Sequence, residues 1–114
     1  MHHKINYLEM AASNLEATQA FFEQVFDWQF QSYGPDYIAF SNAGLDGGFF
    51  RADVHSEQQT CGALVVLYSK ELEATQALVE QAGGRVNKAT FSFPGGRRFH
   101  FIEPSGNEFA VWSE

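Results

Sequence analysis

The stretch LEATQA at residues 15–20 recurs without change at residues 72–77, and Glu23-Gln24 recurs as Glu80-Gln81 in the same register. The offset, from residue 15 to residue 72, is 57 residues, half of the 114-residue chain. Six consecutive identities at half the chain length indicate a duplicated supersecondary unit. The sequence therefore predicts two modules, about residues 1–55 and 56–114, within a single domain that spans residues 1–114.

Both copies of the repeat have apolar residues at helical spacing, which predicts two amphipathic helices. We expect Ser13 to cap the first helix, with Glu16 three residues later completing a capping box. Gly83-Gly84 supplies the left-handed residue that ends the second helix, and at the corresponding place Asp27 has to adopt that conformation.

The residues around the two helices alternate with the period of two that strands require. The predicted strands are residues 5–10, 28–33, 37–41 and 48–52 in the first half, and 63–68, 85–93, 97–102 and 108–112 in the second. The predicted fold class is therefore α+β, with two duplicated βαβββ modules. One helix covers one face of each mixed sheet, and we expect the two open faces to curl around a common cavity where a ligand binds.

The composition excludes several classes of protein. A hydrophobic content of 45% with 18% charged residues fits one compact soluble domain. The net charge of −7 would repel a phosphate backbone, so no nucleic-acid partner is expected. Cys61 is the single cysteine and cannot form an internal disulfide, and the chain shows no leader and no long apolar run. We expect a cytoplasmic protein without a membrane partner.

Two segments carry a family resemblance. The first runs from the strand at residues 5–10 through Asn14-Leu15 and Phe21-Phe22 to Phe26-Asp27-Trp28, and the second is FIEPSGNEF at residues 101–109. They resemble the vicinal oxygen chelate superfamily, which includes glyoxalase I, extradiol dioxygenases and bleomycin-resistance proteins; Glu103 stands where aspartate is usual. The resemblance implies paired βαβββ modules of the glyoxalase and bleomycin-resistance type, assembled as a homodimer.

The resemblance also implies where a divalent metal would be held. Metal-dependent members place His, Glu or Gln ligands on the first and last strands of each module, so that several donors converge on one point. The corresponding positions here are Tyr7, Phe49 or Phe50, Ala63 or Leu64, and Ala110. Because none is a usual ligand type, we expect the family's metal site to be absent and no cofactor to be needed, with Glu9 and His100 as the alternative ligands for a divalent metal.

Seven residues are candidates for the site on the open faces. His100 is the first candidate for acid and base chemistry because its side chain titrates near neutral pH, with Glu9 as an orienting carboxylate or general base and Tyr7 as a donor. Glu9 is alternatively an ion-pair partner of Arg98. The predicted substrate-binding residues are Tyr37, Phe50, Arg98 and Trp112.

Three functions fit these observations. The first is a protein that binds a small organic molecule in the cavity without a metal, as the bleomycin-resistance branch binds its drug. The second is a glyoxalase-like lyase or isomerase that uses Glu9, Tyr7 or His100 as acid or base. The third is a dimeric interaction module, since exposed edge strands favour association.

Overall fold

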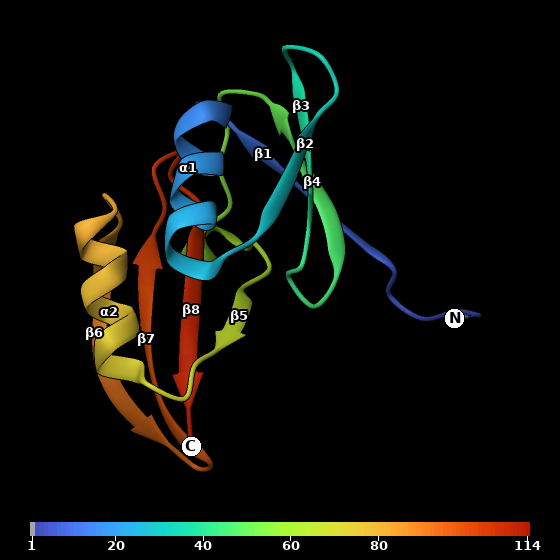
Figure 1. Cartoon of the computed structure of the whole chain (residues 1–114). Helices are drawn as coiled ribbons and strands as arrows, with labels where there is room; N and C mark the ends of the chain where they lie inside the picture. Colours follow the sequence, from blue (N-terminus) through green and yellow to red (C-terminus); the bar gives the residue numbers. More distant parts are fainter. Residues whose placement is uncertain (1) are drawn as a thin grey trace.

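The computed structural model describes residues 2–114 and has the predicted element order, shown in Figure 1. The first module consists of β1 (Tyr7–Ala12), α1 (Leu15–Phe26), β2 (Gln29–Ser32), β3 (Tyr37–Ser41) and β4 (Asp46–Arg51). A linker with one short 3-10 helix, η1 (Gln58–Thr60), follows. The second module consists of β5 (Val65–Tyr68), α2 (Leu72–Gln81), β6 (Arg85–Phe93), β7 (Gly96–Ile102) and β8 (Glu108–Ser113).

The strands form two four-stranded sheets with equivalent topology, β1-β4-β3-β2 and β5-β8-β7-β6. In each sheet the first strand of the module pairs in parallel with the last, and the other neighbours are antiparallel. The duplicated βαβββ architecture is confirmed. The sheets are not closed around one cavity, since among residues 2–114 no strand of one sheet pairs with a strand of the other.

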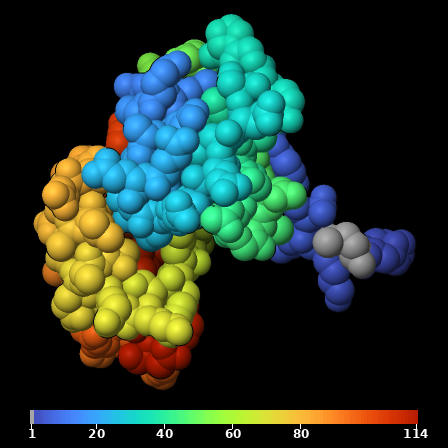
Figure 2. Space-filling view, viewed as in Figure 1, coloured from blue at the N-terminus to red at the C-terminus, as the bar shows by residue number. Residues whose placement is uncertain are grey.

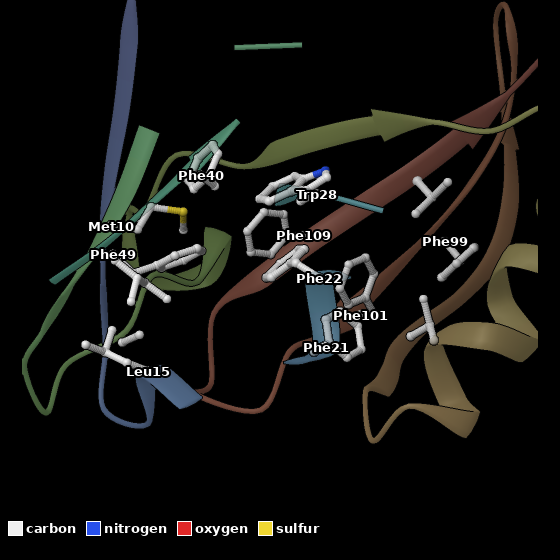
Figure 3. Close-up of a cluster of buried hydrophobic side chains, with 14 of the residues drawn as sticks. Met10, Leu15, Phe21, Phe22, Trp28, Phe40, Phe49, Phe99, Phe101 and Phe109 are labelled. Carbon is white, nitrogen blue, oxygen red and sulfur yellow. The ribbon is translucent and has the colours of Figure 1, made fainter. Parts of the chain in front are cut away.

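Helix α1 joins the two modules through a shared apolar core. The Phe22 ring lies 5.9 Å from Phe49 of β4 and 5.0 Å from Phe109 of β8, measured between ring centroids. Phe21 contacts Phe101 of β7 in the same way. Figure 3 shows these rings as one continuous cluster, and Figure 2 shows α1, in blue, against both halves of the molecule. Truncating a buried Phe of this kind costs about 3–5 kcal/mol, so the core alone fixes the modules to each other.

Two of the three predicted helix ends agree with the structure. Asp27 ends α1 with φ 60° and Gly83 follows α2 with φ 99°, both in the left-handed conformation. The predicted Ser13 cap is wrong: Asn14 caps α1, and its side-chain oxygen accepts from the Ala17 N–H at 3.0 Å. The reason is that α1 begins at Leu15, so the residue in the N-cap position is Asn14, and asparagine is a favoured capping residue.

The first strand of each module begins later than the sequence predicts. β1 begins at Tyr7, two residues later than expected, because the parallel register with β4 starts at the Tyr7 and Asp46 pair, and Ile5 is exposed. β5 starts at Val65, two residues later than expected, and Cys61, which follows η1 with φ 72°, is exposed.

The turn between β7 and β8 fastens the second module to the first. Glu103 is buried, and its carboxylate accepts hydrogen bonds from Thr18 Oγ1 at 2.6 Å, from the backbone N–H groups of Ser105 and Asn107, each at 3.1 Å, and from Asn107 Nδ2 at 2.9 Å. Asn107 Nδ2 also donates to the carbonyl of Ala11 in β1 at 2.8 Å. The network is therefore more than a local turn, because it connects β8 to α1 and β1.

Within residues 2–114, neither helix combines the length and the apolar character that a membrane crossing requires.

Candidate functional site

On the open face of the first sheet, Tyr7, Tyr37 and Glu9 form a hydrogen-bonded chain. Tyr37 Oη donates to Glu9 Oε1 at 3.0 Å, and the two tyrosine hydroxyl oxygens lie 2.5 Å apart. Since the single hydroxyl proton of Tyr37 goes to Glu9, Tyr7 donates to Tyr37. The alternative pairing of Glu9 with Arg98 is not formed, because Glu9 lies on β1 and Arg98 lies on β7 of the other sheet.

Two glycines let aromatic rings cross β4 on opposite faces. A Cβ on Gly48 would lie 2.2 Å from the Tyr37 hydroxyl, and a Cβ on Gly47 would lie 2.3 Å from the Phe40 ring. Any side chain at Gly48 would push Tyr37 away from Tyr7 and Glu9. The hydrogen-bonded chain of Tyr7, Tyr37 and Glu9 therefore depends on the Gly47-Gly48 pair.

The environment of Tyr37 keeps its hydroxyl protonated. Burial is the largest cause, and the hydrogen bonds with Tyr7 and Glu9 add to it; together they raise the pKa of Tyr37 well above its ordinary value. Tyr37 is therefore a hydrogen-bond donor throughout the physiological range. Phe50, opposite Tyr37 in the register of β3 and β4, is exposed.

The open face of the second sheet follows the predicted alternation. Phe99, Phe101, Phe109 and Val111 are buried in the core. The intervening residues of β7 and β8 point to the opposite face, since successive side chains alternate along a strand; these residues are Arg98, His100, Ile102, Glu108, Ala110 and Trp112.

His100 and Glu108 form a buried pair on this face. His100 Nδ1 lies 2.7 Å from Glu108 Oε2, with His100 fully buried and Glu108 5% exposed. The carboxylate of Glu108 also accepts from the backbone N–H of Gln58 at 2.8 Å and from Asn87 Nδ2 at 3.3 Å. The Gln58 bond places η1 at the carboxylate, and the Phe91 ring lies 5.9 Å from the imidazole.

The hydrogen bonds of Glu108 set the state of the pair. Burial alone would raise the pKa of Glu108, but the hydrogen bonds from His100, Gln58 and Asn87 outweigh it and hold this pKa below its ordinary value. Glu108 is therefore ionised near neutral pH and accepts a hydrogen bond from His100 Nδ1–H. In the neutral imidazole this leaves a lone pair on Nε2, which is buried and has no hydrogen-bond partner. Such an atom can accept a proton from a bound molecule.

Arg98 lies over aromatic rings rather than carboxylates. Its guanidinium carbon is 5.3 Å from the centroid of Phe91 and 5.8 Å from that of Phe93, and its Nε is buried without a hydrogen-bond partner. The neighbouring Arg97 points to the helix side of the sheet and forms a 2.5 Å ion pair with Glu73. Arg97 therefore forms an ion pair on the helix side of the sheet, and Arg98 packs against aromatic rings on the open face.

The seven predicted site residues divide between the two sheets. Tyr7, Glu9, Tyr37 and Phe50 lie together on the first sheet, and Arg98, His100 and Trp112 lie on the second. The structure does not bring Trp112 to Tyr37 and Phe50; its ring contacts Tyr68 and Phe93 instead.

Two residues of this site were missed from the sequence. Glu108, the partner of His100, is not among the seven predicted residues. The signal was available: the hairpin register sets Ile102 opposite Glu108, which makes Glu108 the diagonal neighbour of His100. Phe91 had no such signal, because its register with β7 depends on two irregularities in β6.

The side chains at the positions that the resemblance assigns to metal ligands do not suit a divalent metal. Phe49 is in the core, so Phe50 is the open-face residue of β4, and the four positions are Tyr7, Phe50, Ala63 or Leu64, and Ala110. A phenol and three hydrocarbon side chains offer no imidazole or carboxylate donor. Among residues 2–114, no three His, Cys, Asp or Glu side chains gather where they could hold an ion.

Comparison with known proteins shows which family this sequence matches. The sequence profile of the Glyoxalase/Bleomycin resistance protein/Dioxygenase superfamily matches residues 4–111. A search of curated proteins found no match.

Three solved structures show the same fold at low sequence identity. A glyoxalase-related enzyme from Fulvimarina pelagi is 15% identical, with a TM-score of 0.81, covering 98% of this chain and 88% of that one. A mutant fosfomycin resistance protein from Listeria monocytogenes, in complex with Mn(II) and a dihydroxypropylphosphonic acid, is 18% identical, with a TM-score of 0.81 and coverage of 99% and 91%. Lactoylglutathione lyase from Agrobacterium tumefaciens is 17% identical, with a TM-score of 0.73 and coverage of 97% and 93%.

The profile match covers nearly the whole chain. This chain belongs to the Glyoxalase/Bleomycin resistance protein/Dioxygenase superfamily.

Proposed function

We propose that this protein binds a small organic molecule on the open faces of its sheets and does so without the metal site of its family. The observation that carries the proposal is the apolar surface on those faces. Tyr7 and Phe50 on the first sheet, and Val66 and Tyr68 on the second, are between 38% and 46% exposed. Each sheet thus carries a pair of exposed apolar side chains, and neighbouring exposed apolar groups mark a binding surface in a soluble domain.

The side chains at the family's metal positions support the metal-free part of the proposal. A divalent cation needs several oxygen, nitrogen or sulfur donors around it. The phenol of Tyr7 donates to Tyr37, and Phe50, Leu64 and Ala110 have no polar side-chain atom. The reaction of a metal-dependent relative is therefore not carried over to this chain.

A homodimer is the second part of the proposal. Within residues 2–114 the strands form two separate sheets, and neither closes the open face of the other. A second copy can cover these faces symmetrically, since an isologous contact uses the same surface twice. The dimer would then enclose the ligand, which favours binding over a purely structural association.

A screen of metabolites and drugs by thermal shift, in the presence of a chelator, tests the binding function. We expect a raised Tm with at least one compound, since a ligand that binds only the folded state stabilises it. Stabilisation by divalent cations alone would contradict the proposal. Sedimentation of the same sample tests the dimer separately.

An enzyme with a metal-free acid or base is the second candidate, and the His100 and Glu108 pair favours it. An imidazole oriented by a carboxylate, with its second nitrogen unpartnered, is the arrangement of a general base. Glu9 and Tyr7 are the alternative acid or base groups on the first sheet. Lyase or isomerase turnover that survives chelation and is lost in His100→Gln or Glu9→Gln would support this candidate, and unchanged rates in both variants would rule out these roles.

A further inference from the structure

The two buried polar atoms without partners lie side by side in the fold. Among residues 2–114, Arg98 Nε and His100 Nε2 are the buried side-chain nitrogen or oxygen atoms that have no hydrogen-bond partner. Both belong to β7, two residues apart, and therefore point to the same open face. Leaving such an atom unpaired costs about 1–3 kcal/mol, so two of them on one face indicate a place for an external partner.

Phe91 covers this place from the edge of the sheet. Its ring contacts the Arg98 guanidinium and the His100 imidazole. Phe91 lies on β6, the edge strand, where the pairing with β7 shifts register between Val86 and Lys88 and again between Lys88 and Phe91. Irregular edge pairing of this kind occurs next to binding sites, where it redirects a side chain. Movement of Phe91 would open Arg98 Nε without breaking the core.

An apolar hollow adjoins the guanidinium. Its volume is about 370 Å³, and it is lined by Val66, Phe93, Pro94, Gly95, Arg98 and Trp112. Arg98 is the charged group of this lining. A molecule seated in the hollow would therefore rest on hydrocarbon and aromatic surface and meet a cation at one end.

The charge of Arg98 is not neutralised by the protein. Arg97 pairs with Glu73, and Arg51 pairs with Glu16 and Asp36, whereas within the described residues Arg98 has no carboxylate within ion-pair distance. In a chain with a net charge of −7, a partly buried arginine without a carboxylate is an unusual positive site. Lys88, whose ammonium lies 5.7 Å from the Phe91 centroid, adds a second positive charge beside it.

We propose that this hollow binds a ring-bearing carboxylate, with its carboxylate on Arg98 and its ring against Trp112 and Phe93. The inference rests on the proposed small-molecule function and gives it a ligand class and an orientation. A planar guanidinium recognises a carboxylate through two parallel N–H bonds, of which Nε provides one. The aromatic walls then receive the ring, which adds stacking and apolar burial.

Naphthalene-2-carboxylate and its neutral carboxamide are the matched probes. Each is titrated into isotope-labelled protein, and the indole N–H signals of the chain's two tryptophans are followed. We expect the carboxylate to shift the Trp112 signal while the signal of the buried Trp28 stays in place, and to bind at least about tenfold more tightly than the carboxamide. A Trp112→Phe variant assigns the two signals.

Arg98→Met and Arg97→Met are the matched variants, since the two arginines are neighbours on opposite faces of β7. Arg98→Met should remove the preference for the carboxylate, and Arg97→Met should retain it. Arg98→Lys is the control for a folding defect. It keeps the positive charge and should therefore keep part of the preference for the carboxylate.

Three results decide the inference. A lost preference in Arg98→Met alone supports it. Equal binding of carboxylate and carboxamide at Trp112 overturns the ligand class and leaves the proposed binding function in place. If neither probe shifts the Trp112 signal, this site is wrong, and the thermal-shift screen then decides separately whether the protein binds another molecule elsewhere.

Discussion

Two buried carboxylates, five residues apart in the same hairpin, have opposite surroundings. Glu103 accepts from one hydroxyl, two backbone N–H groups and one side-chain amide, all of them uncharged donors that do not titrate near neutral pH. Glu108 faces a histidine whose second nitrogen has no partner. The first arrangement is complete and connects the modules, and the second is incomplete and lies on an open face. Burial alone therefore does not identify a functional carboxylate; the partners do.

The largest effect is expected from Glu103→Ala, which tests the structural half of the comparison. The change leaves four buried hydrogen-bond donors without their acceptor, and we expect the free energy of unfolding to fall by roughly 3 kcal/mol or more. Chemical denaturation measures it. Glu80→Ala, at an exposed position of α2, is the control and should change the free energy by less than about 0.5 kcal/mol. Equal effects in the two variants would contradict the role given to Glu103.

The repeated helices provide a sharper test of the same network. Thr18 and its repeat partner Thr75 occupy the same place in LEATQA, but Thr18 is buried and bonds to Glu103 and Ser105, whereas Thr75 is half-buried and bonds to Ser69. Thr18→Val should lower the free energy of unfolding by about 2 kcal/mol, and Thr75→Val by about 0.5 kcal/mol. Identical losses would mean that Glu103 does not depend on Thr18.

Glu108→Gln tests the second carboxylate through the pH dependence of stability. The pKa of Glu108 in the folded state is below its unfolded value of about 4.3, so its contribution is complete above about pH 5 and is lost as the pH falls through the folded pKa. The wild type should therefore lose more stability than Glu108→Gln between about pH 5 and pH 3. Denaturation at a series of pH values measures the difference, and parallel curves would show that the carboxylate is not stabilised in the fold.

Glu9 is an exposed carboxylate that can be compared with the buried Glu103 and Glu108. We expect the smallest change in the free energy of unfolding here. Tyr37→Phe removes its hydrogen bond, and we expect a loss of about 0.5 kcal/mol, because the groups are partly solvated. The raised pKa of Tyr37 adds a spectroscopic test: in an alkaline absorbance titration, a late-titrating tyrosine should be missing from the variant. A titration curve unchanged in shape would contradict the hydrogen-bonded chain.

The sequence predicted the architecture well because the repeat and the strand period are local signals. The repeat placed both helices, and the alternation in residues 97–112 placed His100, Arg98 and Trp112 on one face. Contacts between distant segments were not predictable in the same way. The bond from Thr18 to Glu103 joins residues 85 positions apart, and the cover of Phe91 over His100 depends on register shifts in β6 that leave no mark in the periodicity.

The sequence also could not show whether the two sheets share the expected cavity. Parity groups the open-face residues of one sheet but does not say whether the two open faces of one chain meet. The expected grouping of Trp112 with Tyr37 and Phe50 failed for this reason, since these residues belong to different sheets.

The central claim is that a small molecule binds the open face of the second sheet at Arg98 and Trp112 without a metal, while the Glu103 turn is structural. Fragment screening by amide and indole NMR, with a chelator present, tests it most directly. We predict that bound fragments shift the signals of residues 98–100 and Trp112 and leave those of residues 103–107 unchanged. Fragments that bind only after a divalent cation is added, or that shift no signal on this face, would contradict the account.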